Sequence, residues 1–193
     1  MKKILISPFE KYAESTLLLV GMLALALGAV MGSYCNARFD GVIDLHFVKA
    51  VGTYEPLLDL LVTVLITAVV LFALGKYRNP KTRLIDLVNT VLIAKIPFYL
   101  LAIFNCTGMI FDASEKVMKS VQENVLNLPD FSVLLPILIF SLITLVALVL
   151  SVVLLFQGFK VATNAKGNKS VFGFVLALLL AEILSKIAIS YLP

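Results

Sequence analysis

Five apolar runs constrain the fold of this chain more than any other feature of its sequence. Each run is about 20 residues long, the length that a helix needs to cross the roughly 30 Å hydrocarbon core of a membrane. Hydrophobic residues make up 61% of the 193 residues and charged residues only 15%. The runs cover residues 15–34, 57–75, 84–104, 132–157 and 171–192. The sequence therefore predicts an all-α integral membrane protein, in which a bundle of five transmembrane helices forms a single membrane domain of residues 1–193.

Basic residues are distributed unevenly over the segments outside these runs. The segment before the first run and the connections after the second and fourth runs hold ten lysines and arginines, whereas the other two connections hold four. Short cytoplasmic segments of membrane proteins carry the excess of basic residues. We therefore expect the N-terminus in the cytoplasm and the C-terminus outside. The net charge of +4 then reflects topology and attraction to anionic headgroups, so membrane lipids are expected partners and nucleic acid is not.

A short interfacial helix is predicted before the first run. In the stretch SPFE, Ser7 has the position of an N-cap, Pro8 that of the first helical residue, and Glu10 follows the cap by three residues. This is the pattern of a helix start. It predicts a helix over residues 7–14 that lies in the headgroup region.

A second interfacial helix is predicted in the third connection. Val117, Val121 and Val125 recur at every fourth position, and charged residues occupy the other faces. This spacing predicts an amphipathic helix over residues 112–126 on the outer surface. Two interpretations are open: a lid over the outer ends of the spans, which we favour, or a helix that binds a partner.

Small residues form a stripe along the first run. Ala24, Gly28 and Gly32 follow one another at four-residue spacing. Such a stripe lets a second helix approach closely in a membrane, where lipid provides no hydrophobic drive for association. A neighbouring helix of the same chain is favoured as its partner over a second subunit, so a homo-oligomer remains open.

Three ionisable residues lie inside the third and fifth runs. Lys95 and Glu182 each lie eleven residues from the cytoplasmic start of their run, and Lys186 follows Glu182 by four residues on the same helix face. Charges near mid-membrane are costly and face the bundle interior with a partner. We therefore expect the three residues to form one cluster in which Lys95 and Lys186 flank Glu182.

Two interpretations of this cluster are open. A buried ion pair can fix the register of helices without stabilising them much, and this structural interpretation is favoured. The functional interpretation is an ion or proton site, or a pocket for a polar headgroup. Pro97 is expected to bend the third run in either case, because it cannot donate to the carbonyl of Ile93 and so frees an acceptor near Lys95.

The two cysteines, Cys35 and Cys106, end the first run and follow the third, which places both at the outer face. In an oxidising exterior they could form a disulfide if the two spans are neighbours. Free thiols are slightly favoured over this disulfide.

Enzyme signatures are missing from the sequence. The only histidine, His46, lies in the first connection without a metal-binding or nucleophile motif around it, and no Gly-rich phosphate loop is present. The same connection favours an extended segment with a turn at Asp40 and Gly41. We therefore expect no catalytic residues, no metal site and no cofactor.

The layout of the chain resembles the YIP-domain family, the Ypt/Rab-interacting membrane proteins and their bacterial relatives. Five spans follow a short N-terminal segment with Ser-Pro-Phe, a proline lies midway along the third span, and few residues follow the fifth. Where eukaryotic members carry Asp-Leu-Tyr-Gly-Pro and a Gly-Tyr-containing stretch before a proline, this chain reads ISPFEKYAE and VLIAKIPFY. The resemblance implies a bacterial-type member of this family.

Two functions follow from these observations. The first is a non-enzymatic membrane protein of YIP-domain type that organises protein partners or lipids, and it is favoured. The alternative is a small transporter or channel that uses Lys95, Glu182 and Lys186.

Overall fold

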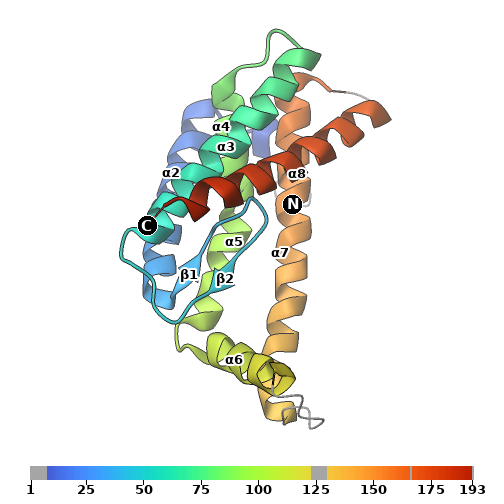
Figure 1. The fold of residues 1–193 in the computed structure, drawn as a ribbon. Coiled ribbons are helices and arrows are strands. Elements are labelled where there is room, and N and C mark those ends of the chain that lie inside the picture. Colours follow the sequence, from blue (N-terminus) through green and yellow to red (C-terminus); the bar gives the residue numbers. More distant parts are fainter. Residues whose placement is uncertain (1–7, 123–129, 166, 193) are drawn as a thin grey trace.

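The computed structural model describes residues 8–122, 130–165 and 167–192, and these form an almost entirely helical bundle (Figure 1). Five helical segments are long and apolar enough to cross a membrane, as the sequence predicts. They are Glu14–Cys35, Glu55–Arg78, Leu84–Asn105, Phe131–Thr163 and Ser170–Ser190. The fold class is therefore an all-α membrane bundle of five spans.

The elements follow the order η1 (Pro8–Glu10), α2 (Glu14–Cys35), β1 (Ala37–Arg38), β2 (His46–Phe47), α3 (Glu55–Arg78), α4 (Leu84–Ala94), α5 (Ile96–Leu101), η2 (Ala102–Asn105), α6 (Met109–Gln122), α7 (Phe131–Thr163) and α8 (Asn168–Ser190). Helix α8 crosses the other spans obliquely, and α6 lies across one end of α7 (Figure 1). We call the end of the bundle with α6 and the two cysteines the disulfide end. The opposite end, where α2 and α4 begin, is the amino-terminal end.

Large apolar side chains cover much of the outside of the bundle. Along α7 the side chains of Leu142, Leu145 and Val146 are more than half exposed, and α8 has a similar exposed apolar face. A helix that is apolar on nearly all sides belongs in a hydrocarbon environment. These exposed faces therefore mark the lipid-facing surface of the spans.

The third span is broken at Lys95, between α4 and α5. Pro97 is the second residue of α5 and has no N–H to give to the carbonyl four residues earlier. The chain therefore makes a turn at Lys95 before the helix resumes. The predicted bend at Pro97 is present, and it places Lys95 at the break instead of on a continuous helix face.

The segment before the first span differs from its prediction. Between Pro8 and the start of α2 at Glu14 the chain forms only a single 3-10 turn, Pro8–Glu10, and Ser7 lies outside the described residues. The N–H groups of Lys11 and Tyr12 both bond to the Pro8 carbonyl, and the turn ends there. One turn of helix is costly to nucleate, and so short a segment has too few bonds to extend it.

Helix α6 forms close to its predicted position. It begins at Met109, three residues before the predicted start, and its described part ends at Gln122. Residues 123–126 of the prediction, including Val125, lie outside the described part of the chain. The helix packs against η2 and α7 at the disulfide end, which is the arrangement expected of a lid over the spans.

The small residues of α2 bring other parts of the same chain close. A Cβ atom at Gly28 would lie 2.7 Å from Cγ of Tyr99, and one at Gly32 would lie 2.8 Å from the ring of Phe39. Gly21 has the same role against Leu92, with a Cβ distance of 2.6 Å, whereas Ala24 is only half-buried. The contact line therefore runs through Gly21, Gly28 and Gly32, and its partners belong to the same chain.

We predict that Gly28→Val destabilises the bundle by about 1–3 kcal/mol, because the added atoms overlap the Tyr99 ring in a packed interior. The control is Ala26→Val, which adds bulk to the exposed face of the same helix and should stay within about 0.5 kcal/mol of the parent. Reversible unfolding in mixed micelles, followed by circular dichroism, measures both. Equal stability of the two variants would contradict this packing.

Candidate functional site

The first connection folds back into the bundle instead of lying on its surface. Its two short strands pair antiparallel, with Ala37 opposite Phe47 and Arg38 opposite His46, and the chain bends at residues 41–43. Phe39 and Val42 are almost fully buried in the main core, which also contains residues of α3, α4 and α8. We call residues 37–47 the inserted loop.

Lys95 holds the turn of the inserted loop from the break between α4 and α5. The side chain of Lys95 is 3% exposed, and its Nζ donates a hydrogen bond of 2.9 Å to the carbonyl oxygen of Gly41. A carbonyl buried without a donor would cost about 1–3 kcal/mol. The buried ammonium of Lys95 therefore satisfies one peptide group of the loop.

Glu182 holds the other side of the same turn from α8. Its Oε2 accepts hydrogen bonds from the backbone N–H groups of Val42, at 2.6 Å, and Ile43, at 3.1 Å. Hydrogen bonds to an ionised acceptor are stronger than those between neutral groups. One carboxylate thus satisfies two consecutive peptide groups that have no partner strand.

Gly41 is required by the close approach of Glu182. A Cβ atom at Gly41 would overlap Oε1 of Glu182 and lie 2.7 Å from Cβ of Asp44. Beyond the turn, Nζ of Lys186 lies 2.5 Å from Oδ2 of Asp44 and 3.6 Å from Oε1 of Glu182. Lys186 therefore joins the loop to α8 a second time and also neutralises Glu182.

The structure gathers Lys95, Glu182 and Lys186 around one loop, but their arrangement differs from the predicted cluster. Lys186 pairs with Glu182 as expected, whereas no ion pair joins Lys95 to Glu182 among the described residues. The peptide groups of residues 41–43 lie between them and bond to both. The prediction paired the charged side chains with one another, whereas their main partners are backbone N–H and C=O groups.

Sequence reasoning placed a turn at Gly41 but missed the close contact of this glycine with Glu182 and the depth of the inserted loop. The available signal was the presence of three apolar residues, Phe39, Val42 and Ile43, on both sides of this turn. Such residues pack inside a protein far more often than they line a solvated loop.

The start of the inserted loop is tied to α3 by a buried carboxylate. Arg38 binds Asp59 through two bonds, Nε to Oδ2 at 2.6 Å and Nη2 to Oδ1 at 3.0 Å, and it reaches Glu55 through Nη1 at 2.7 Å. Asp59 also accepts from the backbone N–H of Phe39 at 3.2 Å. The hydrogen bond with Asp59 raises the pKa of Arg38, so Arg38 keeps its positive charge across the accessible pH range.

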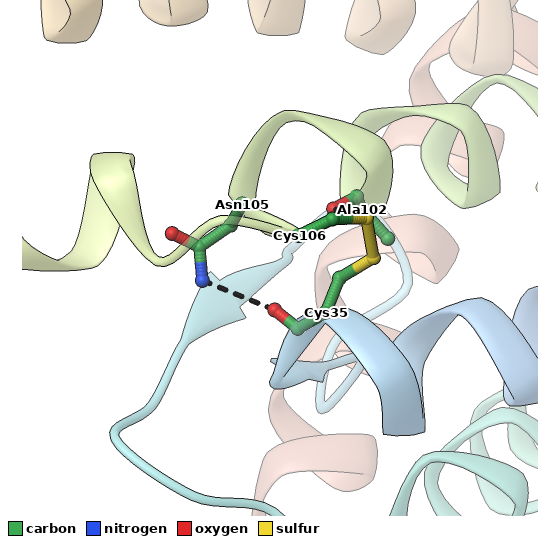
Figure 2. Close-up of a disulfide and its surroundings, with 4 residues drawn as sticks. All are labelled: Cys35, Ala102, Asn105 and Cys106. Atoms are coloured by element: carbon green, nitrogen blue, oxygen red, sulfur yellow. Dashed lines mark hydrogen bonds between the residues drawn. A yellow bond between two sulfur atoms is a disulfide. The ribbon is translucent and has the colours of Figure 1, made fainter.

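Cys35 and Cys106 form a disulfide that joins the end of α2 to the turn after η2 (Figure 2). The preference for free thiols is therefore wrong, because the close packing of α2 on α5 and η2 brings the two residues together. Beside the bond, Asn105 Nδ2 donates to the Cys35 carbonyl at 3.0 Å (Figure 2), and Asn105 Oδ1 accepts from the N–H of Phe111 at 2.9 Å. The disulfide end is thus fixed next to the inserted loop.

His46 pairs with Asp40 across the inserted loop. Its Nδ1 lies 3.1 Å from Oδ1 of Asp40, and the side chain of His46 is 48% exposed. The hydrogen bond to Asp40 raises the pKa of His46 above 6.5. Burial alone would raise the pKa of Asp40, but the hydrogen bond and charge of His46 outweigh burial and lower it below 3.8.

The described residues contain no group of three or more His, Cys, Asp or Glu side chains that could hold a metal ion. Comparison of the chain with protein-family models, with curated proteins and with solved structures found no match.

We predict that Glu182→Leu destabilises the fold by about 2–4 kcal/mol, because it leaves the N–H groups of Val42 and Ile43 buried without an acceptor. Glu182→Gln keeps an acceptor oxygen and should cost less, about 1 kcal/mol. Ile183→Leu, at an exposed apolar position of the same helix, is the matched control. Unfolding free energies in mixed micelles that are equal for Glu182→Leu and Ile183→Leu would refute the role of Glu182.

We predict a pH-dependent contribution from His46 and Asp40. Because the folded pKa of His46 is raised, its contribution is fully present below pH 6.5 and is lost as the pH rises through the folded pKa. Because the folded pKa of Asp40 is lowered, its contribution is present above pH 3.8 and is lost as the pH falls through the folded value. The pair therefore stabilises the fold most between pH 3.8 and pH 6.5.

The measurement is the stability difference between the parent and His46→Gln across pH 4–9. It should reach up to about 1 kcal/mol below pH 6.5, the scale of a partly exposed pair, and shrink above it. The charges of Asp44, Arg38 and Lys186 also act on the pair, so Asp40→Asn is the control that should remove the same pH dependence. A difference that is constant with pH would contradict the pairing.

Proposed function

We propose that this chain is a non-enzymatic membrane protein of YIP-domain type that organises lipids or other membrane proteins. The observation that carries the proposal is that the two mid-span charges bond to the backbone of the inserted loop. Lys95 and Glu182 are bonded to the backbone of the inserted loop, so they act as structural supports for a fixed loop. A protein with this construction presents rigid surfaces to the membrane around it.

The disulfide supports a definite orientation. Disulfides persist in oxidising compartments and are rare in the cytoplasm, and Cys35 and Cys106 lie at the end opposite the connection that follows α3. The last turn of α3 and the connection after it carry Lys76, Arg78, Lys81 and Arg83. Such an excess of basic residues is typical of short cytoplasmic segments. The proposal is an N-terminus in the cytoplasm and a disulfide end outside a bacterial inner membrane.

The alternative function, a small transporter or channel, is less well supported by these contacts. An ion path needs groups that can exchange partners, whereas Lys95 is buried with the Gly41 carbonyl and Glu182 is bonded to two peptide N–H groups. Moving either charge would leave loop peptide groups unpaired at a cost of about 1–3 kcal/mol each.

We predict that the protein in its native membrane crosslinks to neighbouring membrane proteins or retains selected lipids through purification. Proteoliposomes of the parent, of Lys95→Met and of Glu182→Gln should show no proton or cation flux above empty vesicles, while both variants lose stability. Because the charges support the loop, the substitutions lower the stability of the fold and leave ion flux unchanged.

Flux in the parent that disappears in a variant of unchanged stability would overturn the proposal in favour of transport. Recovery of the protein with neither crosslinked neighbours nor selected lipids, in several detergents, would also count against it. A crosslinked second copy of the chain would identify a homo-oligomer as the organised unit.

A further inference from the structure

A polar cavity lies at the amino-terminal end, far from the inserted loop. It has a volume of about 270 Å³ and opens between the start of α2, the start of α4 and the last third of α7. Its lining includes Phe9, Tyr12, Glu14, Arg83, Asp86 and Asn89, together with apolar residues of α2 and α7. Gly158 of α7 forms part of the wall, where a Cβ atom would overlap the side chain of Thr90.

Asn89 lines this cavity and has a buried acceptor atom without a hydrogen-bond partner. The residue is 2% exposed, and its Nδ2 donates a hydrogen bond of 3.1 Å to the carbonyl oxygen of Glu14. That bond fixes the orientation of the amide, and Oδ1 is left with no hydrogen-bond partner. A buried acceptor of this kind destabilises the fold unless a donor reaches it.

The charges of the lining favour a cationic donor. Arg83 binds the carboxylates of both Asp86, at 2.7 Å, and Glu14, so the lining has one more carboxylate than cation. An ionised carboxylate offers about four acceptor positions, and the contacts with Arg83 leave several of them open. Glu14, Asp86 and Asn89 Oδ1 therefore provide three acceptor groups.

A primary ammonium group matches these three acceptors. It carries one positive charge and three N–H donors, whereas a quaternary ammonium has the charge without any donor. Phe9 and Tyr12 offer aromatic surface to the carbon atoms beside the nitrogen. The cavity therefore favours a primary over a quaternary ammonium because only the primary ammonium can donate hydrogen bonds to the three acceptors.

The surroundings of the cavity fit the ethanolamine headgroup of a phospholipid. The cavity lies where α2 and α4 begin, at the end of two spans. A neighbouring hollow of about 430 Å³ shares Val161 with it and is lined by Lys160. An ethanolamine phosphate that extends from one hollow to the other would place its phosphate near this lysine.

We propose that this cavity, lined by Glu14, Asp86 and Asn89, binds a primary ammonium group, and that phosphatidylethanolamine supplies it. The inference rests on the proposed function, since it names the lipid class that the protein organises. A soluble primary amine has the same ammonium chemistry but lacks the acyl chains that the neighbouring spans would contact.

The test is native mass spectrometry of the full-length, delipidated protein with an equimolar mixture of phosphatidylethanolamine and phosphatidylcholine of identical acyl chains. We expect the first bound lipid to be enriched about tenfold in phosphatidylethanolamine, the ratio that about 1.4 kcal/mol of lost hydrogen bonding would produce. Asp86→Asn and Asn89→Leu should reduce this enrichment to near one. Asp112→Asn removes the same charge from an exposed site on α6 and should retain it.

Equal binding of the two lipids by the parent overturns the proposal, and so does an enrichment that all three variants retain. Melting temperatures in phosphatidylcholine alone verify that each variant is folded, and Asp86→Asn tests the site if Asn89→Leu does not fold. Glycerophosphoethanolamine has the same headgroup without acyl chains. If it raises the melting temperature of the parent as much as the lipid does, the ammonium site is supported and its ligand is a soluble amine. If the protein shows no lipid selectivity but still crosslinks to neighbouring membrane proteins, the lipid site is wrong and the proposed function stands.

Discussion

The structure depends on how a few peptide groups are satisfied inside a membrane bundle. Water is absent from the hydrocarbon region, so non-helical backbone there must bond to protein. The turn at residues 41–43 meets this requirement with two side chains, because Lys95 donates to one carbonyl and Glu182 accepts from two N–H groups. The bonds between the turn and these two side chains offset both the cost of burying the charges and the cost of burying the peptide groups.

The remaining features at the disulfide end act on the same loop from its flanks. Arg38 and Asp59 fix where the loop leaves α2, and the disulfide between Cys35 and Cys106 holds α2 beside the third span. The break at Lys95 positions the ammonium toward the loop. The two ends of the molecule therefore differ: the disulfide end is held together by these bonds, while the amino-terminal end has an open polar cavity.

The five spans could be predicted from the sequence because length and hydropathy are local properties that the bilayer thickness imposes. The positions of Lys95 and Glu182 at matched depth also predicted that they would meet in one region. Their actual partner could not be predicted, since backbone N–H and C=O groups are the same in every sequence and carry no signal of where they bond. The unpartnered oxygen of Asn89 is invisible for a similar reason, because it becomes notable only once folding has buried it.

Amide hydrogen exchange of Val42 and Ile43, in the protein reconstituted in lipid nanodiscs, tests the central claim most directly. The account predicts slow exchange at both amides in the parent, and acceleration by about fivefold in Glu182→Gln, the change that about 1 kcal/mol of weakened bonding produces. Amides of Phe98 and Tyr99, which bond to the Lys95 carbonyl, should exchange as in the parent. Exchange of Val42 and Ile43 at the rate of an unprotected chain, or rates that Glu182→Gln leaves unchanged, would contradict an inserted loop held by Glu182.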